Sequence, residues 1–304
     1  MVHRLWQGPV RRVVDKVWHL RVKSLAKSGF HSYQHKLPPE LGIGRMHAIS
    51  TGDRGDGPIW IFVHGFTSQA LDWQPLLSQL TEDCSKIVAM DLPGHGQTGL
   101  PKGHPLSGDD VLEATVDFVR HEVPIERGCV VVGNSMGGLV TAKLTMRLRE
   151  LVRGMVLISP FGAPYTDHEI DSVLEHFTLT DYQRAKNFVL QLFPNGVPPP
   201  GLRAMAIYMW AHFSRKHLVD LMPQARSYPM LTESDLAGMP ETLLIWGTDD
   251  FILPSSGLEF FRKTLSKRSS TILTPARYNH MPFFEMSQHV ANDIRLWAQT
   301  HKLF

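Results

Sequence analysis

Short apolar runs alternate with amphipathic segments over most of the chain. The runs have the length expected of strands that are buried on both faces of a sheet. They lie at residues 46–50, 59–63, 87–90, 130–132, 155–158, 243–246 and 270–273. Helical patterns lie between them, at residues 69–80, 109–122, 137–152, 256–265 and 283–300. Because strands that alternate with helices form a mainly parallel sheet covered on both faces, we predict an α/β fold.

This alternation stops between residues 163 and 240, where helical patterns follow one another without a convincing strand. The helical patterns cover residues 169–177, 181–192 and 203–213, and the Pro-rich stretch PNGVPPPG separates the last two. We predict an inserted helical cap, with the Pro-rich stretch as a hinge candidate. The predicted units are an N-terminal arm (1–30), an α/β core (31–162 and 241–304) and the cap (163–240).

Residues 4–27 have the pattern of a basic amphipathic helix. They contain seven Lys or Arg residues against a single acidic residue, Asp15. Apolar residues recur near helical spacing on one side, and Arg12 and Lys16 lie on the other. The simpler interpretation is a terminal helix that packs its apolar stripe on the domain. The alternative is peripheral contact of residues 1–28 with an anionic membrane surface.

Composition narrows the class of protein further. Apolar residues make up 43% of the 304 residues, which is an ordinary globular share, and the net charge of +2 argues against a nucleic-acid partner. Cys84 and Cys129 are too few for a disulfide framework and are interpreted as buried thiols. No stretch approaches the ~20 apolar residues of a membrane span, and the secretory pattern is missing. We therefore expect a cytoplasmic protein, with peripheral membrane binding as the alternative; the oligomeric state is not indicated.

The sequence GNSMGG at residues 133–138 places a serine between a predicted strand and a predicted helix. A nucleophile elbow requires this context, because a sharp strand-to-helix turn exposes the Ser135 hydroxyl. The pattern Gly-x-Ser-x-Gly is weak evidence by itself. It gains weight only if a base and a carboxylate follow along the chain.

Both groups follow in the expected order. A neutral serine hydroxyl needs a histidine base, and the base needs a carboxylate that fixes its tautomer. GTDDFILP at residues 247–254 places acidic residues after one predicted strand, and NHMPFFE at 279–285 places His280 after the next. The carboxyl ends of parallel strands share one edge of a sheet. We therefore predict that Ser135, an acidic residue and His280 converge at that edge.

These residues resemble the α/β-hydrolase superfamily over about residues 45–300. The resemblance implies an eight-stranded, mostly parallel sheet and the spacing Gly-x-x-Asp-x-x-x-Pro, which selects Asp250 instead of Asp249. It also implies that HGFT at residues 64–67 is the oxyanion turn. The backbone N–H groups of Phe66 and Met136 would then stabilise the oxyanion. The implied reaction needs no metal or cofactor.

The elbow, the short oxyanion turn and the apolar cap are similar to those of carboxylesterases and monoacylglycerol lipases. We therefore expect a serine hydrolase of small-molecule carboxylic esters with an apolar acyl group. One alternative is a carbon–carbon bond hydrolase of ring-cleavage products, although that group usually has a Gly-rich oxyanion turn and a Trp where Met281 stands. The other alternative is a non-catalytic binding module on the same fold.

The predicted helix at residues 203–213 is apolar nearly all round. Such a helix needs cover on more than one side, so core packing is the simpler interpretation. The alternative is that its Met-rich side lines an acyl pocket. In that case Met205, Met209 and Trp210 are the candidate substrate contacts.

Overall fold

A computed structural model describes residues 9–197, 199–265 and 270–304 of the chain. In this described part, eight strands form one sheet in the order β1-β2-β4-β3-β5-β6-β7-β8. The strands are β1 (Phe30–Lys36), β2 (Arg45–Thr51), β3 (Ile59–Val63), β4 (Lys86–Met90), β5 (Cys129–Ser135), β6 (Val152–Pro160), β7 (Glu241–Ile245) and β8 (Ser270–Leu273). The pairs β1–β2 and β2–β4 are antiparallel, and all the others are parallel. The predicted fold class is therefore confirmed.

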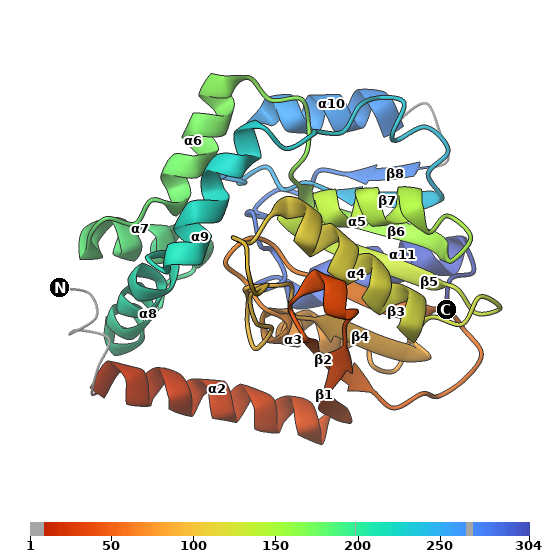
Figure 1. Ribbon diagram of the computed structural model, residues 1–304, viewed down its shortest axis with the longest axis horizontal. Coiled ribbons are helices and arrows are strands. Elements are labelled where there is room, and N and C mark those ends of the chain that lie inside the picture. The colour runs from red at the N-terminus through yellow and green to blue at the C-terminus, as the bar shows by residue number, and fades with distance from the viewer. Residues whose placement is uncertain (1–8, 198, 266–269) are drawn as a thin grey trace.

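Helices cover both faces of the sheet (Figure 1). The helices α3 (Gln74–Leu80) and α11 (Ser287–Thr300) pack on one face, and α4 (Gly108–Glu122), α5 (Met136–Arg147) and α10 (Ser255–Leu265) pack on the other. Successive side chains of β3 point to opposite faces of the sheet, and both faces are apolar. Trp60 and Phe62 belong to the apolar cluster with α3 and α11, whereas Ile59, Ile61 and Val63 belong to the cluster with α4 and α5. Strands buried on both faces account for the continuous apolar runs in the sequence.

The predicted strands are all present, but the structure adds β1, which the apolar pattern did not indicate. β1 is an edge strand with the polar sequence FHSYQHK, of which Phe30 and His35 are buried. Three predicted helices are also shorter than expected. Of the helix predicted at residues 69–80, only α3 (Gln74–Leu80) is an α-helix, because Ala70–Trp73 form a 3-10 turn. The helix after Ser135 ends at Arg147, because β6 begins at Val152, and the last helix begins at Ser287.

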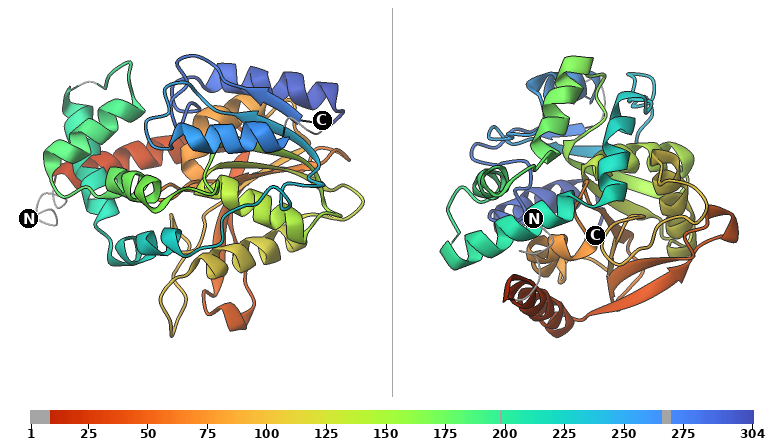
Figure 2. Two further views of the ribbon diagram at one scale, coloured as in Figure 1. Left: turned by 90° about the horizontal axis from the view of Figure 1, so that it is seen from above. Right: turned by 60° about the vertical axis from the view of Figure 1, so that its left-hand side comes forward.

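The segment between β6 and β7 contains four helices among the described residues. They are α6 (Asp167–Phe177), α7 (Tyr182–Leu192), α8 (Pro199–Phe213) and α9 (Lys216–Leu221), followed by a 3-10 turn at Met222–Arg226. The first three correspond to the predicted helices, whereas α9 was not predicted. They gather beside the sheet in all three views (Figures 1 and 2). The proposed hinge is short, because α8 already begins at Pro199.

The N-terminal arm contains the helix α2 (Pro9–Lys27), and residues 1–8 lie outside the described residues. α2 packs against α8, α3 and β1, and Figure 1 shows it along the lower side of the molecule. Arg21 fixes it there through hydrogen bonds to Asp72 (3.1 Å) and to the carbonyl oxygen of Leu71 (2.6 Å). The helix α2 therefore packs on the domain, as the simpler interpretation of the sequence predicted. However, Val17 and Leu20 remain 50% and 57% exposed.

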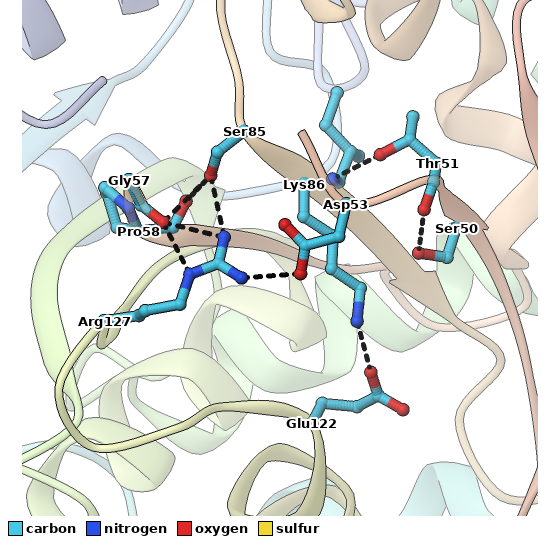
Figure 3. A network of polar contacts seen from close by, with 10 residues as sticks. Ser50, Thr51, Asp53, Gly57, Pro58, Ser85, Lys86, Glu122 and Arg127 are labelled. Carbon is cyan, nitrogen blue, oxygen red and sulfur yellow. Dashed lines mark hydrogen bonds and ion pairs between the residues drawn. The ribbon is translucent and has the colours of Figure 1, made fainter. Parts of the chain in front are cut away.

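A polar network closes the edge of the sheet where β3, β4 and β5 begin (Figure 3). Arg127 pairs with Asp53 at 2.6 Å and donates two hydrogen bonds to the carbonyl oxygen of Gly57, at 2.9 and 3.0 Å. The Arg127 hydrogen bond lowers the pKa of Asp53. Lys86 pairs with Glu122 at 3.1 Å. This network connects the loops at the amino ends of the strands. The candidate site lies at the opposite, carboxyl ends.

Candidate active site

Ser135 occupies a strained turn at the carboxyl end of β5. Its backbone has φ 54° and ψ −122°, and α5 begins at the next residue, Met136. A positive φ is uncommon for a residue with a side chain and is typical of functional turns. Gly137 allows the turn, because a Cβ atom there would lie 2.2 Å from the carbonyl oxygen of Val63. The predicted strand–turn–helix context of Ser135 is therefore present.

His280 and Asp250 form a buried hydrogen-bonded pair. The Nδ1 nitrogen of His280 lies 2.9 Å and 3.1 Å from the two carboxylate oxygens of Asp250, and the side chains are 3% and 2% exposed. Because a carboxylate can only accept, Nδ1 carries the proton and the neutral ring keeps its lone pair on Nε2. Asp249 instead is exposed and accepts a hydrogen bond from Thr248 at 2.8 Å. Of the two acidic residues, Asp250, the one that the motif spacing indicated, is therefore the partner of His280.

The surroundings of Asp250 keep it ionised. Burial alone raises its pKa, but the positive charge that His280 carries when it is protonated and the His280 hydrogen bond act in the opposite direction. The backbone N–H groups of Ile252 and Leu253 also donate to the carboxylate, at 2.9 and 3.1 Å. Together these contacts lower the pKa of Asp250 below its ordinary value. The carboxylate is thus a permanent acceptor for the histidine.

Ser135 faces two cavities. The first, which we call the His280 cavity, has a volume of about 40 Å³ and is lined by His280 as well as Ser135. The second, the α5 cavity, has a volume of about 110 Å³ and is lined by Met136 and other residues of α5. Phe66 lines both. In the described structure the buried Nε2 of His280 has no hydrogen-bond partner, so it makes no hydrogen bond to Ser135, which lines the same cavity.

The turn after β3 lies directly against Ser135. A Cβ atom at Gly65 would be only 3.1 Å from the Ser135 Cβ. His64 orients this turn, because its Nε2 accepts the Leu92 N–H at 3.0 Å while Nδ1 donates to the Gly65 carbonyl oxygen at 2.8 Å. Burial lowers the pKa of His64, which favours this neutral form. The Gly65 carbonyl and the Phe66 N–H belong to one planar peptide, so fixing one fixes the other.

Two positioning contacts were not predicted from the sequence. Buried Asn134 donates from Nδ2 to the carbonyl oxygens of Ile158 (2.9 Å) and His280 (3.0 Å), which holds the histidine loop against the elbow. The position of Asn134 directly before Ser135 in the sequence could have indicated a role at the site. His212 on α8 donates from Nε2 to the Thr67 carbonyl oxygen at 2.9 Å. No sequence pattern links residues so far apart.

The three candidate contacts on α8 lie in different surroundings. Met209 lines the His280 cavity. Met205 and Trp210 line neither that cavity nor the α5 cavity, and instead pack, partly buried, against the apolar cluster that the helices after β6 share with α5 and α10. The reason is that α8 is held between α7 and α2, which cover much of its apolar surface. Core packing thus accounts for Met205 and Trp210.

A second group of Ser, His and Asp residues lies at the side of the sheet formed by β1, β2 and β4. Ser32 lies 2.8 Å from Nε2 of His47, whose Nδ1 lies 2.7 Å from Asp91. This group differs from the first in the setting of its serine, because Ser32 lies within the regular antiparallel pairing of β1, without a strained turn. Asp91, like Asp250, also accepts two backbone N–H groups, here those of Ala70 and Gln97. The contacts of Ser32, His47 and Asp91 therefore have a structural role, because they connect β1, β2 and the loop after β4.

The fold and the strained serine beside a buried His–Asp pair define a class. The model of the alpha/beta hydrolase family matches residues 60–292, so the chain belongs to this family. A monoacylglycerol lipase of Homo sapiens is 24% identical over 241 residues, which are 71% of this chain and 68% of that protein. A 2-(acetamidomethylene)succinate hydrolase of Mesorhizobium japonicum is 26% identical over 180 residues, which are 57% of this chain. The chain spans 61% of the length of that relative.

Solved structures agree on the fold. A bacterial membrane phospholipase A superposes with a TM-score of 0.77 at 19% identity, over 96% of both chains. At this identity the likeness shows the fold alone. In the part of the chain that the structure describes, no helix has the length and apolar character needed to cross a bilayer.

Proposed function

We propose that the protein is a serine hydrolase of carboxylic esters with an apolar acyl group. In this proposal Ser135 is the nucleophile, His280 the general base and acid, and Asp250 the residue that orients His280. The observation that carries it is the buried Asp250–His280 hydrogen bond, which leaves the Nε2 lone pair in a cavity shared with the strained Ser135. A triad is recognised by such geometry and roles.

The reaction follows from these positions. Nε2 of His280 takes the hydroxyl proton as the Ser135 oxygen attacks the ester carbonyl carbon, and Asp250 stabilises the imidazolium that forms. The backbone N–H groups of Phe66 and Met136 donate to the oxyanion of the tetrahedral intermediate. When the carbon–oxygen bond to the alcohol breaks, His280 gives its proton to the leaving oxygen. A water molecule, deprotonated by His280, then attacks the acyl carbon, and as the bond from that carbon to the Ser135 oxygen breaks, His280 returns the proton to Ser135 and the acid leaves.

Several observations favour ester hydrolysis over the two alternatives. The two cavities at Ser135 are lined mostly by apolar side chains, which suits an ester of an apolar acid. The turn Gly65–Phe66–Thr67 and Met281 after the histidine differ from the pattern of carbon–carbon bond hydrolases. A binding module usually lacks one member of the triad, whereas all three are present here. The human relative named monoacylglycerol lipase also supports an ester substrate.

The N-terminal helix is included in the proposal as a contact with an anionic membrane surface. Val17 and Leu20 are exposed on α2, and the side chains of Arg12, Lys16 and Lys23 are exposed on the same helix. Apolar groups flanked by cations bind anionic interfaces, because the apolar groups enter the headgroup region while the cations meet the lipid charge. A hydrolase of apolar esters would meet its substrate there.

Ester hydrolysis is tested with p-nitrophenyl esters from acetyl to palmitoyl, assayed beside a vinylogous diketone of the ring-cleavage type. We expect turnover of the esters that is lost in Ser135→Ala, and no carbon–carbon cleavage. Turnover of the diketone alone would favour the carbon–carbon bond hydrolase. A folded wild-type protein that converts neither substrate would contradict the proposal.

A further inference from the structure

The two cavities have different roles if the proposed reaction is correct, and the inference below rests on that function. The departing alcohol must receive its proton from Nε2 of His280, so it leaves through the His280 cavity. The acyl group lies on the other side of the carbonyl carbon, in the α5 cavity. His280 does not line the α5 cavity, which supports this assignment.

One face of α5 forms a wall of the α5 cavity along its length. Met136, Leu139, Val140 and Lys143 all line it, at positions i, i+3, i+4 and i+7 of the helix. Residues at this spacing share one helix face. Apolar walls from other elements include Leu112, Phe161, Val173, Leu174, Leu221 and Met222. The cavity is therefore apolar from Ser135 as far as Lys143.

Lys143 is a cation at the far end of this apolar wall. Its Nζ lies 5.1 Å from the centre of the Tyr228 ring, and in the described structure it makes no hydrogen bond or ion pair. Burial lowers the pKa of Lys143, and the carboxylates of Asp109 and Asp235 offset this only in part. A partly desolvated ammonium group without a direct acceptor is favourable for an anionic ligand.

The spacing of Met136 and Lys143 along α5 gives the approximate length of the ligand. Lys143 lies seven positions after Met136, which is about 10 Å along a helix axis at 1.5 Å per residue. An extended chain of carbon–carbon bonds of ~1.5 Å rises by about 1.3 Å per carbon. The wall therefore matches an acyl chain of about eight carbons.

We infer that the α5 cavity selects half-esters of dicarboxylic acids, with about seven methylene groups between the ester carbonyl and a carboxylate that pairs with Lys143. The ester carbonyl lies at Ser135, the methylene groups contact the apolar wall, and the free carboxylate accepts hydrogen bonds from Nζ. Lys143 is then a specificity-determining residue for the hydrolysis.

Two esters with the same number of acyl carbons separate charge from chain length. They are the mono-p-nitrophenyl ester of azelaic acid, which has a free carboxylate, and p-nitrophenyl nonanoate, which has a methyl group instead. We expect wild type to prefer the azelaic half-ester in kcat/KM. Lys143→Met should lower kcat/KM for the half-ester about tenfold, mainly through KM, as expected when one charge-assisted hydrogen bond is lost. It should leave the nonanoate within about twofold of wild type.

Two variants serve as controls. Lys143→Arg keeps the charge and should retain at least part of the preference for the half-ester. Lys102→Met removes an exposed lysine that lines neither cavity and should change nothing. If Lys143→Met changes both esters equally, or wild type prefers the nonanoate, the inference is overturned while the esterase proposal stands. If wild type converts neither ester, the proposed function fails and the inference falls with it.

Discussion

The Nε2 nitrogen of His212 donates a hydrogen bond of 2.9 Å to the carbonyl oxygen of Thr67. His212 lies on α8, in the helical segment between β6 and β7, and Thr67 follows Phe66 in the turn against Ser135. Thr67 has a positive φ of 62°, so the turn is held in a conformation that its sequence does not favour. The bond thus couples the helical segment to the proposed oxyanion turn.

His212 should make stability depend on pH. Burial, with the nearby charge of Arg215, lowers the pKa of His212 to about 3. The unfolded chain has the ordinary value of about 6.5, so it binds the proton more strongly. Stability is therefore present above about pH 6.5 and is lost as pH falls from there toward 3. At pH 4.5 the loss from this group is about 2–3 kcal/mol, because one pKa unit corresponds to about 1.4 kcal/mol.

Urea unfolding of wild type and His212→Gln at pH 7.0 and 4.5 measures this loss. Glutamine keeps an N–H donor for Thr67 but does not titrate, so the variant should lose about 2–3 kcal/mol less on acidification than wild type. The buried His64 and His95, whose pKa values burial also lowers, leave a pH dependence in the variant that is common to both proteins. His31→Gln changes an exposed histidine and serves as the control. Equal acid losses in His212→Gln and wild type would contradict the assignment.

Asn134 should act on the reaction through His280. In Asn134→Ala the carbonyl oxygens of His280 and Ile158 lose their donor, which should cost about 2–3 kcal/mol of the free energy of unfolding. The looser histidine loop should lower kcat for a p-nitrophenyl ester about 10- to 100-fold with little change in KM. Asn292→Ala, on an exposed position of α11, should change neither quantity. A kcat within twofold of wild type would show that Asn134 does not position His280.

The outer surface of α2 should bind anionic vesicles. Val17→Asn combined with Leu20→Asn should lower the partition coefficient on phosphatidylglycerol-containing vesicles about 30-fold, since each exposed side chain contributes roughly 1 kcal/mol when it enters the interface. Added salt should weaken binding of the wild type, because it screens the basic residues. Leu296→Asn, which changes a 71% exposed leucine on α11, is the matched control. Vesicle sedimentation that shows equal binding of all variants would exclude this surface.

Much of the fold could be predicted because buried strands leave a strong pattern. The strand β3 and the first residues of β5 are continuous apolar runs, and the motif that begins at the end of β5 indicated the position of Ser135. The edge strand β1 gave no such pattern, because most of its side chains are not buried. Its strand conformation depends on backbone pairing with β2, which leaves no apolar pattern in the sequence. The six-residue helix α9 is too short to show a helical period.

The candidate site was predictable only as far as chain order and motif spacing could reach. Spacing distinguished Asp250 from Asp249, and the structure pairs Asp250 with His280. The cavities were not predictable, since they depend on how α5 and the helices after β6 come together. For that reason the Met-rich stripe of α8 suggested a pocket at Trp210, whereas packing between α7 and α2 occupies much of that surface.

The central claim is that Ser135 is an activated nucleophile, and covalent labelling with a fluorophosphonate tests it most directly. The structure offers a second candidate, Ser32 beside His47, so the label must be located by peptide mapping. The account predicts one adduct, on the peptide that contains Ser135, which is lost in Ser135→Ala, strongly slowed in His280→Ala and unchanged in Ser32→Ala. A folded wild-type protein that takes no label, or one that carries the label on Ser32, would contradict it.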